Sequence, residues 1–306
     1  MSRIYDALQR ADLERQAAQG KDAAENPDPY LASSPEDLSP IEAGVSLGNT
    51  VLHAWKPSLV SLPTLGDRGE SIEQFRALRS QIYQFRDQNP LKTILVSSGM
   101  PEEGKTFVAA NLAVSLARNR NNTVLLIDAD LRRPALHAVL GAPSTPGLTE
   151  YLAGSAEVSD ILQRNENSRI VEDGIMVGIP DLAFIPAGAG GDNSSELVAN
   201  HRIEELVAGL SPHFDWILID SPPVLAFADA IDVARAADAV LLVARGATTP
   251  FDVAQRAQAA FANSRILGFV LNAVKETQRG TSYYYDYGKQ DASIGSPTRK
   301  DKRRQG

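Results

Sequence analysis

One short segment constrains this chain more than any other. Gly99 to Thr106 reads GMPEEGKT and fits the phosphate-loop pattern G-x-x-x-x-G-K-[ST]. An apolar run over 93–97 precedes the segment and a helical pattern over about 105–119 follows it, which is the strand–loop–helix context that the pattern requires. The segment therefore predicts a site where backbone N–H groups hold the phosphates of a nucleotide.

Two further apolar runs end in a carboxylate. Leu125 to Pro134 reads LLIDADLRRP, and Trp216 to Pro223 reads WILIDSPP. An unpaired carboxylate at the end of a buried strand is unfavourable, so Asp128 and Asp220 call for an explanation. Helix N-caps are the simple alternative. The further charges that follow Asp128, with Asp130 first, exceed what a cap needs, and favour metal binding or acceptance of a proton.

Together the three segments predict binding and cleavage of ATP with Mg²⁺. Lys105 would reach the β- and γ-phosphate oxygens, and the Thr106 hydroxyl would bind Mg²⁺. Asp220, followed by Ser-Pro-Pro, suits a carboxylate that holds the metal through water. The group that receives the phosphoryl is left open by these residues.

The composition excludes several classes of protein. The 306 residues are 43% hydrophobic, enough for one large α/β core, and the net charge of −8 argues against a general nucleic-acid binder. The absence of Cys excludes disulfides and thiolate metal sites and fits a cytoplasmic protein. We find no apolar run near 18 residues and no signal peptide, so we expect membrane contact only through a partner.

The hydrophobic pattern predicts one α/β domain between two polar ends. We expect an N-terminal helix and a flexible linker over 1–66, with the helix at 2–19, a domain over 67–274, and a disordered tail over 275–306. Apolar runs that alternate with helical stretches predict a mostly parallel sheet with helices on both faces, and a small hairpin or irregular insertion over 163–181. The strand candidates are 93–97, 123–127, 182–185, 216–219, 239–243 and 267–271, and the helical stretches are 70–87, 105–119, 134–140, 194–209, 228–236 and 250–263.

These motifs carry a family resemblance. The chain resembles, over roughly residues 68–288, the cytoplasmic domain of the bacterial tyrosine kinases of capsule and exopolysaccharide export, the CpsD/CapB type. The Walker A, Walker A′ and Walker B motifs of that family correspond here to GMPEEGKT, LIDADLR and LIDSPP. The family also has an E-x-x-R-x-x-R helix that contacts neighbouring subunits, and a tyrosine cluster that is autophosphorylated. The matching residues here are Glu73, Arg76 and Arg79 for the helix, and Tyr283, Tyr284, Tyr285 and Tyr287 for the cluster.

The resemblance implies a P-loop fold of the MinD/ParA type and an ATP-dependent tyrosine autokinase. Lys105 would stabilise charge on the phosphoryl group, and Asp128 would accept the tyrosine proton. Asp130 would bind Mg²⁺ together with Thr106 and Asp220. The roles of Asp128 and Asp130 can be exchanged. The implied nucleotide site comprises Gly99, Met100, Pro101, Glu102, Glu103, Gly104, Lys105, Thr106, Phe107, Arg132 and Asn272. The resemblance also implies a ring-like homo-oligomer and a separate transmembrane adaptor that recruits the protein to the inner face of the cell membrane.

Two of these segments also have an interpretation of their own. Four of the eight tyrosines fall within a few residues of one another in a polar tail, where an aromatic core patch is not expected, so phosphorylation is favoured. The charges at Glu73, Arg76 and Arg79 alone indicate only a solvated helix face.

The phosphate loop departs from the family at one position. Phosphate loops of the family usually have Gly at the position of Glu102. The general pattern allows another residue there when φ is negative.

Two other functions fit parts of the sequence. A MinD- or ParA-like switch ATPase would share the fold and both acidic strands, but that class usually has an early Lys in its loop, where this chain has Met100-Pro101-Glu102-Glu103. A scaffold that binds ATP without cleaving it is the second alternative. The basic cluster over 299–304 indicates a solvated end, or attraction to anionic lipid.

Overall fold

The computed structural model describes most of the predicted domain. The predicted helix at 2–19 and the tyrosines at 283–287 lie outside the described residues, and so does the basic cluster. The described residues are 50–66, 69–119, 122–166, 171–172, 175–176, 179, 181–191 and 194–274.

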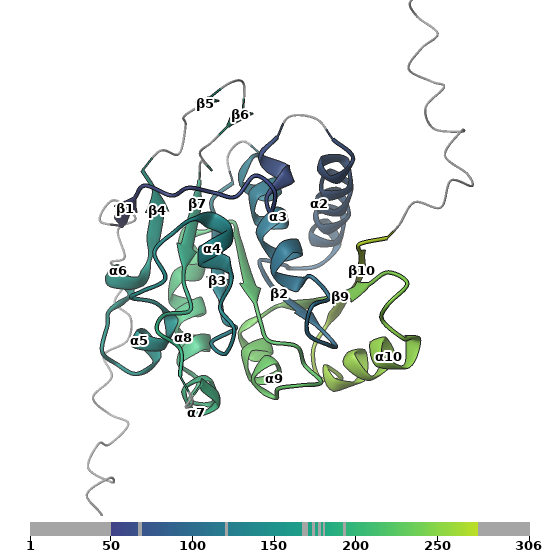
Figure 1. Cartoon of the computed structure of the whole chain (residues 1–306). Helices are drawn as coiled ribbons and strands as arrows, with labels where there is room; N and C mark the ends of the chain where they lie inside the picture. Colours follow the sequence, from purple (N-terminus) through teal and green to yellow (C-terminus); the bar gives the residue numbers. More distant parts are fainter. Residues whose placement is uncertain are drawn as a thin grey trace, which may run out of the picture. The chain divides into compact units, whose positions relative to one another are not determined.

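An eight-stranded sheet forms the centre of the domain (Figure 1). Its order is β1-β4-β7-β3-β8-β2-β9-β10, and neighbours are parallel except β4 and β7, which are antiparallel. All of the predicted strands are present, and the mostly parallel sheet is confirmed. The bounds are β1 Val51–His53, β2 Thr93–Ser98, β3 Val124–Asp128, β4 Gln163–Asn165, β7 Leu182–Ile185, β8 Trp216–Asp220, β9 Ala239–Arg245 and β10 Ile266–Asn272.

Helices cover both faces of this sheet, as predicted (Figure 1). One face packs on α2 (Glu70–Gln88), α3 (Lys105–Ala117) and α4 (Leu136–Leu140). The other face packs on α5 (Leu148–Leu152), α6 (Val158–Ile161), α7 (Ser194–Ala199), α8 (Arg202–Leu210), α9 (Asp229–Val233) and α10 (Phe251–Ala260). Among the described residues, the 3₁₀ turns η3 (Pro63–Leu65), η4 (Ser211–His213) and η5 (Ala234–Ala236) lie between these elements. No helix in the described ranges is both long and apolar enough to cross a membrane.

The central strands are apolar throughout because both of their sides are buried. In β2, Leu95 packs on the face of α8 and α9, whereas Ile94 and Val96 pack on the face of α3. The continuous apolar run in the sequence therefore reflects the parallel sheet. Since parallel strands all end at the same edge, the loops after β2, β3 and β8 meet there, and the motifs lie on those loops.

The predicted linker extends too far into the domain. Residues 50–66, which we assigned to a flexible segment ending at 66, contribute β1 and η3 to the domain, and Trp55, Leu62 and Leu65 are buried. Their order comes from tertiary contacts: Trp55 packs edge-on against Phe184 of β7, with ring centroids 6.1 Å apart. A local pattern rich in Pro and Ser does not report contacts of this kind.

The region over 163–181 and the predicted helix over 194–209 also differ in part from the prediction. The expected hairpin is present as β5 (Val171–Glu172) and β6 (Ile175–Met176), which are antiparallel. However, β4 joins the main sheet although its sequence, QRN, has no strand pattern. The stretch over 194–209 is two helices, because His201 takes a positive φ of 59° between α7 and α8.

Candidate active site

The phosphate loop joins β2 to α3 in the predicted geometry. Gly104, the residue before α3, has a φ of 93°, which favours glycine. No side chain caps α3, so its first N–H groups remain available to an anion, and the helix dipole favours negative charge there. A Cβ at Gly104 would lie 1.9 Å from Nδ2 of Asn272, so the space at this position is also restricted. The loop is therefore built to bind phosphate.

Lys105 lies among the predicted acids. Its Nζ is 2.8 Å from Oδ2 of Asp130 and 4.0 Å from Oδ1 of Asp220. Burial would lower the pKa of Lys105, but the charges of Asp220, Asp130 and Asp128 outweigh it and raise the pKa. Lys105 is therefore a permanent cation that neutralises the acidic cluster in the absence of a nucleotide.

Asp220 has one satisfied oxygen and one that accepts no hydrogen bond from the described residues. Oδ2 accepts a hydrogen bond of 2.6 Å from the Thr106 hydroxyl, whereas the buried Oδ1 has no such donor. Burial raises the pKa of Asp220 to about 6, against the lowering effects of Lys105 and Thr106. A buried carboxylate oxygen without a donor, beside a hydroxyl, fits the oxygen ligands that Mg²⁺ takes, directly or through water.

Asp128 is fully buried beside Asp220 and holds the loop that follows β3. Its Oδ1 accepts from the N–H of Asp130 at 3.2 Å, and its Oδ2 accepts from those of Ala135 and Leu136 at 3.2 and 3.1 Å. Burial and, after it, the nearby charge of Asp220 raise the pKa of Asp128 to about 8, against the lowering effect of the backbone hydrogen bonds. Asp128 is therefore not the N-cap residue of a helix, since Ala135 takes that position before α4. Its carboxylate instead accepts hydrogen bonds from the first N–H groups of that helix and also belongs to the acidic cluster.

Glu102 departs from the expectation for its backbone. Its φ is 64°, in the left-handed region, and not negative as the phosphate-loop pattern would allow for a non-glycine residue. This conformation costs a residue with a Cβ about 1 kcal/mol or more relative to glycine. A positive φ favours glycine, the residue that the family resemblance implies at this position. The carbonyl of Glu102 accepts a hydrogen bond of 3.0 Å from Arg245 at the end of β9.

The sequence did not predict two residues that contact the loop, Arg245 and Thr249. Glu103, predicted only as part of the nucleotide loop, is buried, and its carboxylate accepts hydrogen bonds from the N–H of Met100 at 2.8 Å and from the hydroxyl of Thr249. Thr249 and Arg245 were not among the predicted site residues. No local pattern marks them, because Arg245 reaches the loop from the end of β9 and Thr249 reaches it from the connection between β9 and α10.

The other predicted nucleotide residues lie at different distances from the loop. Asn272, at the end of β10, donates to the carbonyl of Glu103 at 3.0 Å, so it is in place beside the loop. Phe107 packs against Phe75 of α2, with ring centroids 5.9 Å apart. Arg132 is held elsewhere by Asp229, Ser195 and Phe227: its Nε is 2.9 Å from Oδ2 of Asp229, and it lies 4.5 Å over the ring of Phe227. Its contact with a phosphate stays a prediction.

The predicted contact helix is α2. Glu73 and Arg76 form an exposed ion pair of 2.5 Å with each other. Arg79 instead donates to the carbonyl of Ser115 at 2.5 Å and so ties α2 to α3. Glu73 and Arg76 therefore lie together on the exposed surface of α2, whereas Arg79 binds the neighbouring helix α3.

Comparison with known proteins identifies the family. Residues 94–295 match the family described as the CobQ/CobB/MinD/ParA nucleotide binding domain. The chain is 32% identical over 215 residues to tyrosine-protein kinase YwqD of Bacillus subtilis, an alignment that covers 70% of this chain and 85% of that protein. This chain belongs to the family of bacterial tyrosine-protein kinases. Its domain is a nucleotide-binding domain of the P-loop class.

Other members of the kinase family are longer or structurally known. The chain is 33% identical over 212 residues to tyrosine-protein kinase ptk of Acinetobacter johnsonii, which covers 69% of this chain but only 27% of that protein. The chain thus spans less than a third of the length of the longer curated relatives, of which ptk is one. The kinase domain of Escherichia coli tyrosine kinase ETK matches with a TM-score of 0.64 and 29% identity, covering 77% of this chain and 87% of that domain.

Proposed function

We propose that this protein is an ATP-dependent protein-tyrosine kinase that phosphorylates the cluster at Tyr283, Tyr284, Tyr285 and Tyr287 in trans, on the tail of an adjacent subunit. One observation carries the proposal most strongly: Lys105, Thr106, Asp130 and Asp220 converge at the start of α3 within hydrogen-bond or ion-pair distance. Membership in the tyrosine-protein kinase family supports tyrosine as the acceptor.

Phosphoryl transfer depends on alignment and on neutralisation of charge more than on covalent chemistry of the protein. The N–H groups of the loop and of the start of α3 bind the β-phosphate, and Lys105 binds the oxygens of the transferred group. Thr106, Asp130 and Asp220 hold Mg²⁺, which supplies further neutralisation of phosphate charge when bound. Asn272 contacts the adenine from the end of β10.

The tyrosine hydroxyl must lose its proton as the phosphoryl arrives. We assign Asp128 as the acceptor, because burial and Asp220 raise its pKa and so make it a stronger base than an ordinary Asp. Asp130 is the alternative acceptor, since it contacts Lys105 directly and is nearly as buried. Asp128→Asn and Asp130→Asn separate the two: the base variant loses transfer to tyrosine but keeps binding Mg²⁺-nucleotide, whereas the metal-ligand variant loses the Mg²⁺ dependence of binding.

The kinase is proposed to act at the inner face of the cell membrane in exopolysaccharide or capsule production. A separate transmembrane adaptor recruits it, and α2 with Glu73, Arg76 and Arg79 contacts the next subunit of a ring. Each phosphate adds about −1.5 to −2 charges to the tail, so phosphorylated tails repel one another and weaken the ring. We propose that this cycle regulates polymerisation and export.

Intact mass after incubation with Mg²⁺-ATP tests the activity. We compare the wild-type chain with Lys105→Met, with a variant that carries Phe at all four tail tyrosines, and with Tyr30→Phe as the control outside the tail. Phosphate increments in the wild-type chain and the control, and none in the other two, are expected. ATP consumption without any increment, also after the adaptor's cytoplasmic tail is added, would instead favour the switch ATPase of the MinD/ParA type.

A mixing experiment tests transfer between subunits. Lys105→Met keeps the acceptor tail but lacks the catalytic cation, and the Phe-tail variant keeps the site but lacks acceptors. Mixed with Mg²⁺-ATP, the pair should yield phosphate on the Lys105→Met chain. Phosphate that appears only in the wild-type chain and never in the mixture would show transfer within one subunit.

A further inference from the structure

Glu103 has a buried carboxylate in the phosphate loop that neither the proposed phosphate contacts nor the metal ligands use. Only 3% of its surface is exposed. Oε2 accepts the N–H of Met100 at 2.8 Å and so closes the loop upon itself, while Oε1 accepts the hydroxyl of Thr249. A carboxylate buried at this point requires such donors. Its contacts are all to groups that shape the loop.

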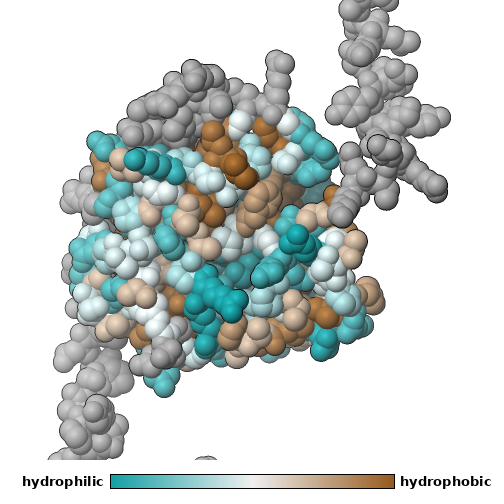
Figure 2. Space-filling view, in the orientation of Figure 1, coloured by the Kyte–Doolittle hydropathy of each residue, from teal (hydrophilic) through white to brown (hydrophobic). Residues whose placement is uncertain are grey.

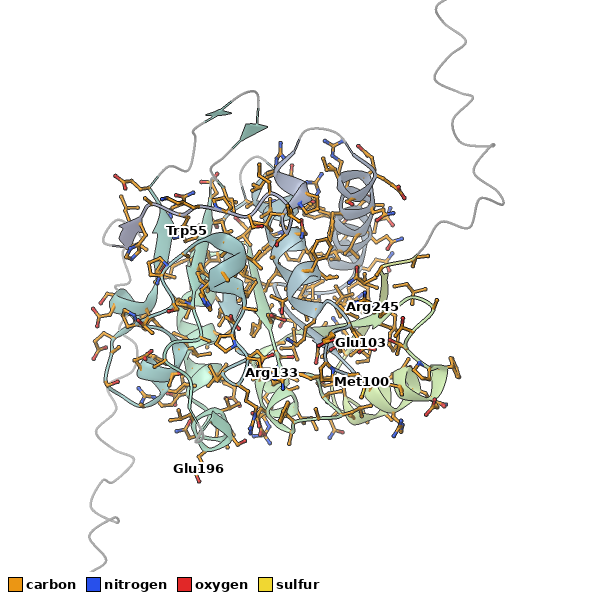
Figure 3. The ribbon with its side chains drawn as sticks, viewed as in Figure 1. Trp55, Met100, Glu103, Arg133, Glu196 and Arg245 are labelled. Atoms are coloured by element: carbon orange, nitrogen blue, oxygen red, sulfur yellow. The ribbon has the colours of Figure 1, made fainter. Side chains whose placement is uncertain are left out.

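Two more hydrogen bonds reach the same part of the loop from outside. Arg245 donates to the carbonyl of Glu102, and Asn272 donates to the carbonyl of Glu103, both at 3.0 Å. Figure 3 shows Met100, Glu103 and Arg245 close together, beside the connection between β9 and α10. Hydrophilic side chains also gather over the middle of this face in the space-filling view (Figure 2). The loop is therefore tied to the ends of both β9 and β10.

These ties act on a strained backbone. Glu102 has a φ of 64°, a conformation that a residue with a Cβ leaves when nothing holds it. The restraints lie on both sides of it, because Met100 N–H is fixed before Glu102 and the Glu103 carbonyl after it. A loop that relaxed at Glu102 would turn its N–H groups away from the phosphates, so the restraints hold the binding conformation.

We propose that Glu103 is a positioning residue of the phosphate loop: its carboxylate, anchored by Thr249, holds the loop in the conformation that receives the phosphates, against the strain at Glu102. The inference rests on the proposed nucleotide site. It assigns Glu103 no contact with ATP or Mg²⁺, so the residue acts through the backbone of the loop. It also makes nucleotide binding depend on Thr249, which lies far away in the sequence.

Nucleotide affinity of the full chain tests this role. The dissociation constants of Mg²⁺-ADP and Mg²⁺-ATP are measured by calorimetry for the wild-type chain, Glu103→Ala and Glu103→Gln, with Glu196→Ala as control. Glu196 is exposed on α7, remote from the loop (Figure 3). We expect Glu103→Ala to lose about tenfold or more in affinity, and Glu103→Gln to stay within about threefold, because the amide can accept from Met100 and donate to Thr249.

Two further variants separate positioning from loss of folding. Added to Glu103→Ala, Glu102→Gly should recover most of the lost affinity, since glycine adopts a positive φ without strain and needs no restraint. Thr249→Val should weaken binding and Thr249→Ser should preserve it. The inference is overturned if Glu103→Ala binds nucleotide as tightly as the wild type does, or if Glu103→Gln loses as much affinity as Glu103→Ala. It is also overturned if Glu102→Gly restores none of the affinity that Glu103→Ala loses. A wild-type chain that binds no nucleotide would refute the proposed site itself.

Discussion

Asp128 and Asp220 are paired residues on neighbouring parallel strands: in the register of β3 and β8, their Cα positions are partners. Both are almost completely buried, at 0% and 1% exposure. Burial is the main cause that raises the pKa of each carboxyl, and nearby negative charge adds to it, from Asp220 at Asp128 and from Asp130 at Asp220. In the absence of ligands, Lys105 offsets part of the negative charge of this cluster, and a bound Mg²⁺ would offset more of it.

The free energy of unfolding should therefore depend on pH. Between the ordinary pKa of an Asp and the raised values of about 8 for Asp128 and about 6 for Asp220, the folded protein holds protons that the unfolded chain has released. The nucleotide-free protein should then lose stability as pH rises from about 5 to 8, by on the order of 1 kcal/mol per pH unit. Urea unfolding across this range measures it. Asp220→Asn should flatten the profile, and a wild-type profile that rises with pH would contradict the burial effect.

Lys105→Met should affect stability as well as activity. Because Lys105 neutralises the acidic cluster, its loss should abolish phosphoryl transfer and lower the free energy of unfolding by about 1–3 kcal/mol at pH 8. The loss should be smaller at pH 6, where Asp128 is protonated. Urea unfolding at both values checks this, with the exposed Lys56→Met as control. Equal destabilisation at the two pH values would argue against a neutralising role.

Gly104→Ala should abolish nucleotide binding. The new Cβ would lie 1.9 Å from Nδ2 of Asn272, so either that side chain or the loop must move. Alanine would also have to adopt a φ of 93°, at a cost of about 1–3 kcal/mol. Calorimetric titration with Mg²⁺-ADP and urea unfolding measure the two effects. Gly268→Ala is the matched control, since φ there is 145° and no atom lies within 4 Å of the Cβ. Similar losses in both variants would mean that backbone strain and not the collision decides.

The two arginines of α2 should behave differently. Arg79→Ala removes the hydrogen bond to Ser115 and should lower the free energy of unfolding by about 1–2 kcal/mol. Arg76→Ala removes only an exposed ion pair and should change it by less than about 0.5 kcal/mol. Urea unfolding of dilute protein measures both, and analytical ultracentrifugation measures assembly. Arg76→Ala is therefore the clean test of subunit contact: an assembly that it leaves intact would remove Arg76 from the proposed interface.

Much of the site could be read from the sequence because its parts are local. The phosphate loop needs a strand before it and a helix after it, and each acid of Asp128 and Asp220 ends an apolar run. Since parallel strands end at one edge, the sequence also implied that these parts meet. Family resemblance added the assignment to tyrosine kinases, which the comparisons confirm.

The remainder depends on contacts between distant segments. The place of residues 50–66 in the domain, the pairing of β4 and the restraint of Glu103 by Thr249 have no local signal, because each stems from a partner far along the chain. The sign of φ at Glu102 belongs here too. By itself, the sequence determined the fold class and the chemical groups of the site, since motifs and hydrophobic periods are properties of neighbouring residues. Only the tertiary structure decided how the loop is held and how the carboxylates share charge, since burial and hydrogen bonding depend on what the fold brings together.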